Sequence, residues 1–91
     1  MAFEWDVWKA AANYEKHGVR FPEPLPVFED DYAITITDDE SDPDEQRFVT
    51  LGMGVKERVL VVVYCYRGMN IRILSARQAE AHERSQYEES R

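Results

Sequence analysis

Three arginines lie in the β-branched middle of the chain, at positions where they could bind a phosphate group. Arg47 and Arg58 each begin an apolar run, and Arg77 follows a third. A guanidinium group binds phosphate through paired N–H donors and stabilises the charge that builds on a phosphorane. Tyr64 and Tyr66, in the second run, could stack on a base or share a proton. This combination suits an RNA phosphodiester.

A candidate proton-transfer group lies nearer the N-terminus. His17 follows Lys16 in the chain, and histidine is the residue type that most often moves protons near neutral pH. RNA carries its own nucleophile, the 2′-OH, so a metal-free ribonuclease must only position it, move protons and neutralise the phosphorane. His17 can equally be a histidine that caps the C-terminus of a helix. Lys9 and Asn13 share its predicted helix face, where plain solvation is the favoured interpretation, and Lys9, Lys16 and Tyr66 are the candidate RNA contacts.

Other chemistries have weaker support in the sequence. His17 and His82 lie on different predicted helices, and the acidic stretch Asp38–Glu45 lacks the glycine of an EF-hand loop. A single cysteine, Cys65, excludes an internal disulfide and a cysteine-based zinc site, and its apolar surroundings disfavour a reactive thiolate. We therefore expect no metal and no cofactor.

The elements that must position these side chains follow from the capping and breaking residues. Asp6 predicts the start of a helix over residues 7–17, and Gly18 predicts its end. On this helix Trp8, Ala11, Ala12 and Tyr14 lie opposite Lys9, Asn13, Lys16 and His17. The prolines within residues 22–26 allow only a turn or a short irregular helix ending near Phe28.

From residue 32 onwards, β-branched and apolar residues alternate with a period of two, which predicts a mainly antiparallel sheet. Strands are expected at residues 2–5, 32–37, 47–52, 58–66 and 71–74. Ser75 with Gln78 resembles a capping box that begins a final helix over residues 76–87. The prediction is an α+β domain, with N-terminal helical segments and a C-terminal helix covering one face of a β-meander.

The expected hairpin registers place the candidate residues on one face of that sheet. Symmetric closure at residues 52–57 and 67–70 makes directly opposed side chains share a face. The open face would carry Arg47, Arg58, Tyr64, Tyr66, Ser75 and Arg77 among Val49, Leu60, Val62 and Ile73. The other face would carry Phe48, Val59, Val61, Val63, Cys65 and Leu74, and the helices would cover it. Arg72 also falls on this covered face and is interpreted as structural. A one-residue slip would reverse these assignments.

Length and charge bound the class of protein. The 91 residues, 44% hydrophobic, fit one domain over 1–91, and neither a signal peptide nor a membrane span is recognisable, so a cytoplasmic protein is expected. The net charge of −7 hides a segregation, because residues 21–46 hold ten acidic and no basic residues while residues 47–77 carry a net charge of +5. The acidic loop, at about residues 38–46, is interpreted as a solubilising loop or as a patch for a basic partner segment.

An ordered set of short motifs along nearly the whole chain resembles the BrnT toxins of type II toxin–antitoxin systems. The set comprises Phe3-Glu4-Trp5-Asp6, Lys9, Asn13, Lys16-His17-Gly18-Val19, Phe28-Glu29-Asp30, Arg47-Phe48, Gly52, Arg58-Val59-Leu60-Val61-Val62-Val63-Tyr64, Ile71-Arg72-Ile73-Leu74-Ser75-Ala76-Arg77, Glu83-Arg84 and Tyr87-Glu88-Glu89. The resemblance implies a RelE-like fold, a ribosome-independent ribonuclease that slows growth, and neutralisation by a BrnA antitoxin. It also implies that the ribbon-helix-helix part of BrnA binds operator DNA, so that this chain would meet DNA only indirectly, in a complex that represses its own operon.

The resemblance and the residue chemistry converge on one hypothesis. His17, Arg47, Arg58 and Arg77 fall on family-typical positions, and an endoribonuclease would use Arg58 and Arg77 on the phosphate, Arg47 to assist, and His17 with Lys16 or Tyr64 for proton transfer. The prolines of residues 22–26 and the acidic loop depart from the family pattern. The acidic loop motivates the alternative, a degenerate member that acts only as an antitoxin-binding and co-repressor module.

Overall fold

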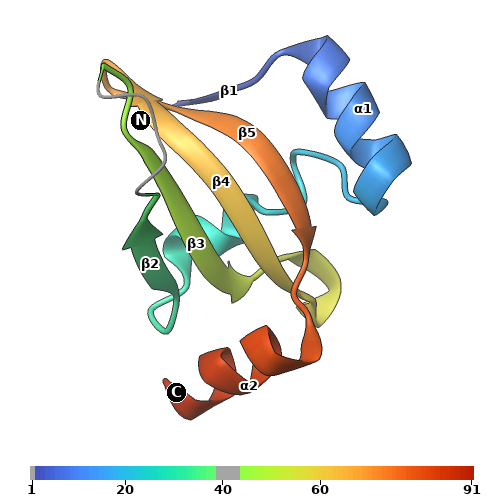
Figure 1. Ribbon diagram of the computed structural model, residues 1–91, viewed down its shortest axis with the longest axis vertical. Helices are drawn as coiled ribbons and strands as arrows, with labels where there is room; N and C mark the ends of the chain where they lie inside the picture. Colours follow the sequence, from blue (N-terminus) through green and yellow to red (C-terminus); the bar gives the residue numbers. More distant parts are fainter. Residues whose placement is uncertain (1, 39–43) are drawn as a thin grey trace.

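The computed structural model describes residues 2–38 and 44–91, and within them five strands form one sheet in the order β1-β5-β4-β3-β2. β1 runs parallel to β5, and the other neighbours are antiparallel (Figure 1). The predicted α+β class with a β-meander is confirmed. The strands are β1 (Phe3–Glu4), β2 (Ile34–Thr37), β3 (Arg47–Met53), β4 (Val59–Arg67) and β5 (Asn70–Gln78).

The first helix, α1 (Val7–His17), has the predicted bounds because both of its ends are capped. The Asp6 carboxylate accepts hydrogen bonds from the backbone N–H groups of Trp8 and Lys9, at 2.8 and 3.1 Å. Gly18 ends the helix in the left-handed conformation, with φ of +69°. The prolines that follow limit the next segment to one short 3₁₀ helix, η1 (Leu25–Glu29), as predicted.

The last strand is longer than predicted, and the final helix begins later. Ser75 does not cap a helix, because residues 75–78 continue β5 and pair with β4 as far as Leu60↔Gln78. The observed helix is α2 (Ala81–Glu89), whose capping box is made by Glu80 and Glu83. A long partner strand therefore overrides a local helix-start signal at Ser75.

The register of the β3–β4 hairpin differs from the predicted one, and that of the β4–β5 hairpin departs from it partway along β5, so the faces differ as well. β3 and β4 are joined through η2 (Val55–Glu57), with positive φ at Lys56 and Glu57, and pair as Leu51↔Val61 rather than Leu51↔Arg58. An offset of three residues is odd, so it moves the β3 side chains to the other face relative to β4. The second hairpin begins in the predicted register, but a bulge at Leu74 then shifts Ser75 and Arg77 by one residue.

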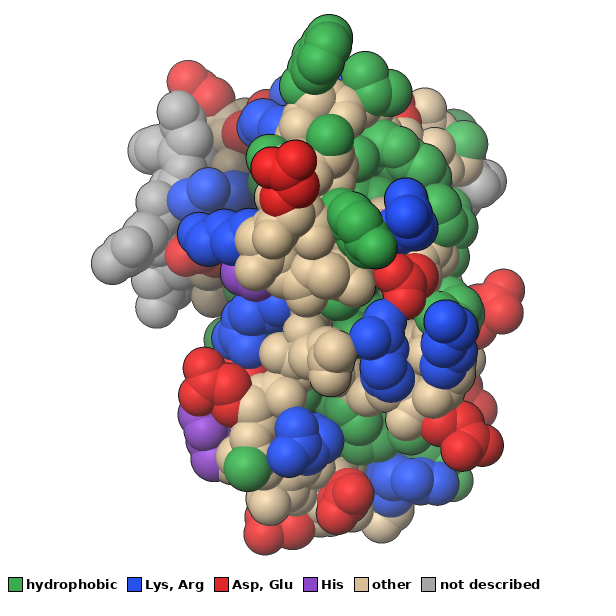
Figure 2. Space-filling model, turned by 90° about the vertical axis from the view of Figure 1, so that its right-hand side faces the viewer, with side chains coloured by type: hydrophobic (Ala, Val, Ile, Leu, Met, Phe, Trp, Pro, Cys, Tyr) green, Lys and Arg blue, Asp and Glu red, His purple; other side chains and the backbone are tan. Residues whose placement is uncertain are grey.

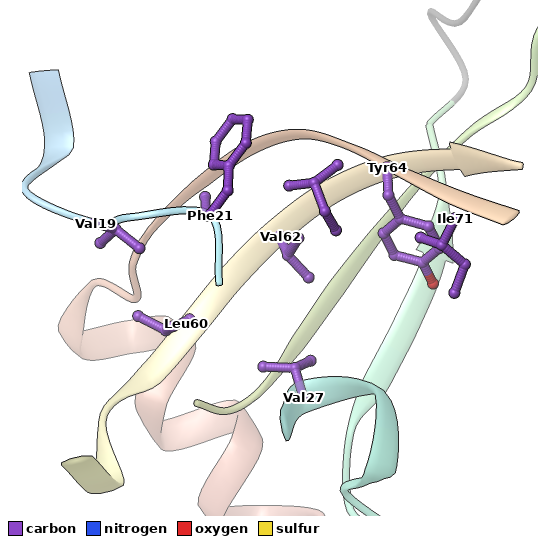
Figure 3. Packing of buried hydrophobic residues seen from close by; sticks show 9 residues of the cluster. Val19, Phe21, Val27, Leu60, Val62, Tyr64 and Ile71 are labelled. Atoms are coloured by element: carbon purple, nitrogen blue, oxygen red, sulfur yellow. The ribbon is translucent and has the colours of Figure 1, made fainter. Parts of the chain in front are cut away.

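One face of the sheet is covered by the segment that links α1 to β2. Leu60, Val62 and Tyr64 of β4 and Ile71 and Ile73 of β5 are buried there beneath Val19, Phe21 and Val27 (Figure 3). Pro24, in the same covering segment, is also among the fully buried residues. This covered face is therefore the larger part of the core.

The opposite face carries α2 over only part of its area. Tyr87 of α2 packs with Leu51, Val59, Val61 and Ala79 in a second, smaller cluster. The helical elements therefore pack on both faces, with η1 behind the sheet and α2 at the lower ends of β3 and β4 in Figure 1. This corrects the expectation that the helices share one face.

α1 lies beside the outer edge of β5, and a polar side chain fixes it there. The Asn13 amide donates to the carbonyl oxygens of Val19 and Ala76, at 2.9 and 2.8 Å, and its oxygen accepts from the Ala76 N–H at 3.0 Å. The contact with Ala76 imitates the paired hydrogen bonds of a neighbouring strand. The helix face of Asn13 is thus the inner one, and Trp8, 82% exposed, lies outside.

Most of the acidic loop, residues 39–43, lies outside the described residues. No helix within residues 2–38 and 44–91 is long and apolar enough to cross a membrane.

Candidate functional site

A shallow hollow of about 220 Å³ lies where α1 meets β5. Three candidate residues from the sequence, Lys9, Lys16 and His17, line it from the helix. Asn13 forms part of the floor, and Ser75 faces them from the strand. The remaining lining residues are Ala12 and Leu74. The fold thus gathers the basic face of α1 around one small surface depression.

The basic side chains of this hollow are not engaged elsewhere in the described part of the chain. Lys9 and Lys16 are exposed and His17 is half-buried, and no ion pair forms to any of the three within residues 2–38 and 44–91. Lys16 and His17 also stand in the last turn of α1, where the backbone carbonyls favour positive charge. An anion entering the hollow would meet donors without displacing an internal carboxylate.

The sheet face next to the hollow carries two of the predicted arginines. Ser75 lies opposite Val63, and Val63 lies opposite Val49, so these three half-buried residues form a row across the sheet. Arg77 and Arg47 lie on the same face, in the rows on either side of this one. The prediction that Arg47, Ser75, Arg77 and Val49 share a face is therefore confirmed. The same face also carries Val61 and Cys65, which were predicted on the opposite one.

Arg77 is held by α2. Its guanidinium donates to both carboxylate oxygens of Glu83, at 2.8 and 2.9 Å, and to the carbonyl oxygen of Gln78 at 3.2 Å. This hydrogen-bonded ion pair lowers the pKa of Glu83 to about 2 and raises that of Arg77. The pair fixes the direction of the Arg77 side chain and leaves it about one-third exposed.

The other two predicted arginines are paired as well, but differently. Arg47 lies 3.5 Å from Asp38, measured from Nε to a carboxylate oxygen, and this Nε makes no hydrogen bond within the described residues. Arg58 pairs with Glu23, in the segment that covers the other face of the sheet. The expectation that Arg58 shares the open face with Arg77 is therefore wrong, because Arg58 has the same side-chain direction as Leu60 and Val62.

The two tyrosines are also placed on the covered face. Tyr64 is 4% exposed, its hydroxyl hydrogen bonds with that of Thr50 at 2.7 Å, and its ring packs on Phe28 and Phe48. Tyr66 is half exposed and contacts the rings of Tyr64 and Phe48. The prediction that Tyr64 and Tyr66 stand among the arginines is wrong, because the β3 offset and the bulge in β5 separate them.

Two residues that matter to the site were not recognised in the sequence. Glu83 orients Arg77, and Asn13, interpreted as solvated, is 7% exposed and anchors α1. The sequence signal for Glu83 was its place three residues after Glu80, which fits a capping box. Arg72 lies on the face of Cys65, as predicted, and pairs with Glu4 at 3.2 Å.

Figure 2 shows the side of the molecule that carries α1. Lys and Arg side chains are spread across its middle, and exposed hydrophobic side chains lie at its top, near α1. Across residues 2–38 and 44–91, no three His, Cys, Asp or Glu side chains are grouped as they would be around a metal ion. The local chemistry is that of a small cationic surface beside an open sheet face.

The fold defines a small α+β protein with a five-stranded sheet, and comparison with known proteins names its family. The family model described as the ribonuclease toxin BrnT of type II toxin–antitoxin systems matches residues 5–83. The chain belongs to this family, so the resemblance read from the sequence is confirmed. Membership implies an RNA substrate and an antitoxin partner. No curated protein matches the chain.

A solved structure supports the fold. The crystal structure of the Brucella abortus ribonuclease toxin BrnT, at 1.1 Å resolution, superimposes with a TM-score of 0.69. The alignment covers 88% of this chain and 97% of that one, at 23% identity. The overall arrangement of strands and helices is therefore similar to that of the Brucella abortus protein.

Proposed function

We propose that this protein is an endoribonuclease toxin that cleaves RNA without a metal ion, and that the scissile phosphate binds at the hollow between α1 and β5. The observation that carries the proposal is the set of basic side chains on α1, Lys9, Lys16 and His17, which line one hollow and have no ion pair within the described residues. Arg77 and Arg47 lie on the neighbouring sheet face, each beside a carboxylate partner that a phosphate would have to replace.

The proposed reaction needs only groups of this chain and of the RNA. The 2′-oxygen attacks the adjacent phosphorus as its proton leaves, the bond to the 5′-oxygen breaks, and that oxygen takes up a proton, leaving a 2′,3′-cyclic phosphate. His17 is proposed to move protons, with Lys16 beside it, while Arg77 and Arg47 stabilise the phosphorane. Tyr64 is left out because it is buried, and Arg58 because it pairs with Glu23.

The finer identity of the partner is part of the proposal. A BrnA-like antitoxin with a ribbon-helix-helix part would neutralise this toxin in the cytoplasm, and DNA would be bound through that antitoxin. The support is family membership together with the acidic residues 21–46, which suit a basic partner segment.

A second function is favoured by the ion pairs. Arg47, Arg58 and Arg77 each have a carboxylate partner within the chain, so none is free to meet a phosphate without exchange. A catalytically degenerate member would keep these pairs and act only as an antitoxin-binding and co-repressor module. Expression of the chain without antitoxin separates the two functions, because an active toxin arrests growth and a module does not.

Cleavage of labelled RNA in excess EDTA tests the ribonuclease directly. We expect the protein to cleave, Arg77→Ala to lose about 100-fold or more of the rate, and Arg58→Ala to lose only a few-fold. The variants are prepared identically, because contaminating ribonuclease would cleave in every sample. Cleavage that disappears with the chelator would disprove the metal-free reaction, and equal loss in both variants would disprove the assignment of the phosphate to the face of Arg77.

A further inference from the structure

Within residues 2–38 and 44–91, the outer edge of β2 has no neighbouring strand. β2 is the last strand in the order β1-β5-β4-β3-β2, and its one neighbour among the described residues is β3 (Figure 1). Such an edge offers backbone donors and acceptors to any extended chain that approaches it.

The register identifies the backbone groups that this edge presents. The N–H of Asp38 donates to the carbonyl of Arg47, so Asp38 and Arg47 form a hydrogen-bonded pair of the β2–β3 ladder. Hydrogen bonding alternates along an antiparallel strand, so Ile36 and Ile34 point their backbone groups at β3. Thr35 and Thr37 then point theirs outwards, and no hydrogen bond reaches those groups from the described residues.

A groove with an apolar floor runs beside this edge, between β2 and α2. Two adjoining hollows, of about 590 and 120 Å³, share Ile34, Ile36 and Gln86 as lining residues. Ile36 is 60% exposed, although it lies opposite the half-buried Val49 on the same face. Apolar side chains of a strand added to β2 would fall into this groove at every second position.

The walls of the groove are acidic. The two charged residues that line it, Glu83 and Glu89, are both acidic and come from α2. Glu83 is neutralised by Arg77, whereas Glu89 forms no ion pair among the described residues. At one end, Arg91 lies over the ring of Tyr32, 5.7 Å from its centre. Charge complementarity therefore favours a segment that carries Lys or Arg beside its apolar residues.

We propose that an extended segment of the antitoxin pairs antiparallel or parallel with the outer edge of β2 and inserts alternate apolar side chains between β2 and α2. The segment has basic residues on its remaining positions. This inference rests on the proposed function in taking the antitoxin as the partner, and it adds the place and the mode of binding.

Binding there would act on the candidate ribonuclease site through α2. The groove is bounded by Glu83, whose carboxylate holds Arg77, and by Val49, which belongs to the open face. A partner segment in the groove would therefore stabilise the ion pair between Glu83 of α2 and Arg77. It would also shield the adjacent sheet face from RNA.

A single backbone substitution tests the strand pairing. Thr37→Pro removes one outward N–H from an edge strand, a position that tolerates proline, and Thr37→Val is the matched control that keeps this N–H. In titration calorimetry with a purified BrnA-type antitoxin as the probe, we expect Thr37→Pro to weaken binding about 5- to 10-fold and Thr37→Val less than 2-fold. Ile36→Ser should weaken binding about 10-fold, and Glu89→Gln should do so only at low salt.

The outcomes separate this proposal from the proposed function. Unchanged affinity in both Thr37→Pro and Ile36→Ser would overturn the pairing at β2 while leaving the antitoxin as a partner. No binding of the unaltered protein to the antitoxin would overturn both. If the protein alone is a dimer in light scattering and Thr37→Pro makes it a monomer, the edge pairs with a second copy, and the antitoxin is the wrong occupant. Urea unfolding, measured without antitoxin, shows that the variants are folded whether or not the protein cleaves RNA.

Discussion

At the scale of single residues, Asn13 decides where the candidate site lies. Its amide occupies the edge of β5 beside Ala76 and so brings Lys9, Lys16 and His17 of the same helix to the hollow. An aliphatic side chain could bury as much surface, but it would leave the N–H and C=O of Ala76 without partners. Asn13 is therefore both a polar residue and part of the core.

Replacing Asn13 with Ala should destabilise the protein strongly. Three hydrogen bonds are lost and the Ala76 backbone groups stay buried, so the free energy of unfolding should fall by about 2–4 kcal/mol in urea denaturation. The exposed neighbour Glu15→Ala is the control and should change it by less than about 0.5 kcal/mol. Equal effects of the two substitutions would contradict the anchoring role of Asn13.

At the scale of elements, the turn between β3 and β4 sets the register of these two strands. It also packs closely against the segment that links α1 to β2. Gly54 sits where an added Cβ would overlap the Leu60 side chain and lie 3.0 Å from the Glu23 carbonyl oxygen. The same segment is joined to this turn by the hydrogen bond from Val55 N–H to Glu23. The turn and residues 22–24 are thus packed against each other with no room for a methyl group.

Gly54→Ala should therefore cost more than an alanine placed at a free glycine. We expect a loss of about 2–3 kcal/mol of unfolding free energy, because Leu60 or the Glu23 backbone must move. Gly18→Ala, with open space around it but a left-handed backbone, should lose about 1 kcal/mol. The reverse order in thermal or urea unfolding would show that this turn is loosely packed.

At the scale of the whole molecule, the fold pairs charges that the sequence separates. The acidic residues 21–46 supply the partners of Arg47, Arg58 and Arg67, namely Asp38, Glu23 and Glu45. α2 is joined to the rest through Arg77–Glu83 and through the Tyr87 hydroxyl, which donates to Asp30. Carboxylates therefore hold the C-terminal helix in place.

Acid should weaken this attachment over a defined range. Ion pairing and hydrogen bonding hold the pKa of Glu83 at about 2, below its ordinary value of 4.5, so its contribution is complete above pH 4.5 and is lost as the pH falls towards 2. Burial raises the pKa of Asp30, but hydrogen bonds from Tyr87, Met53 and Tyr32 outweigh it, and the net lowering has the same sign.

Urea unfolding of Glu83→Gln across pH measures this contribution. The variant should be less stable than the unaltered protein by about 2 kcal/mol at pH 7, allowing for the partial exposure of Arg77, and the difference should disappear near pH 2. The exposed Glu88→Gln serves as the control. A difference that is the same at pH 7 and pH 2 would show that Glu83 acts through packing and not through its charge.

The sequence by itself determined the local structure and the family. Asp6 and Gly18 fixed the ends of α1, the prolines limited the next segment to a short 3₁₀ helix, and β-branched runs predicted the strands. Helix capping, the fixed φ of proline and the alternation of side chains all act between near neighbours in the chain. The basic residues of α1 also came together as expected, since one helix carries them at neighbouring turns.

Only the tertiary structure decided which residues face each other. A five-residue turn between Met53 and Val59 and the bulge at Leu74 set two registers, and each odd offset moved a set of side chains across the sheet. Tyr64 and Arg58 thereby left the face of Arg77, while Ser75 reached the hollow of His17. These choices depend on packing between segments far apart in the chain, where no local signal reports the outcome.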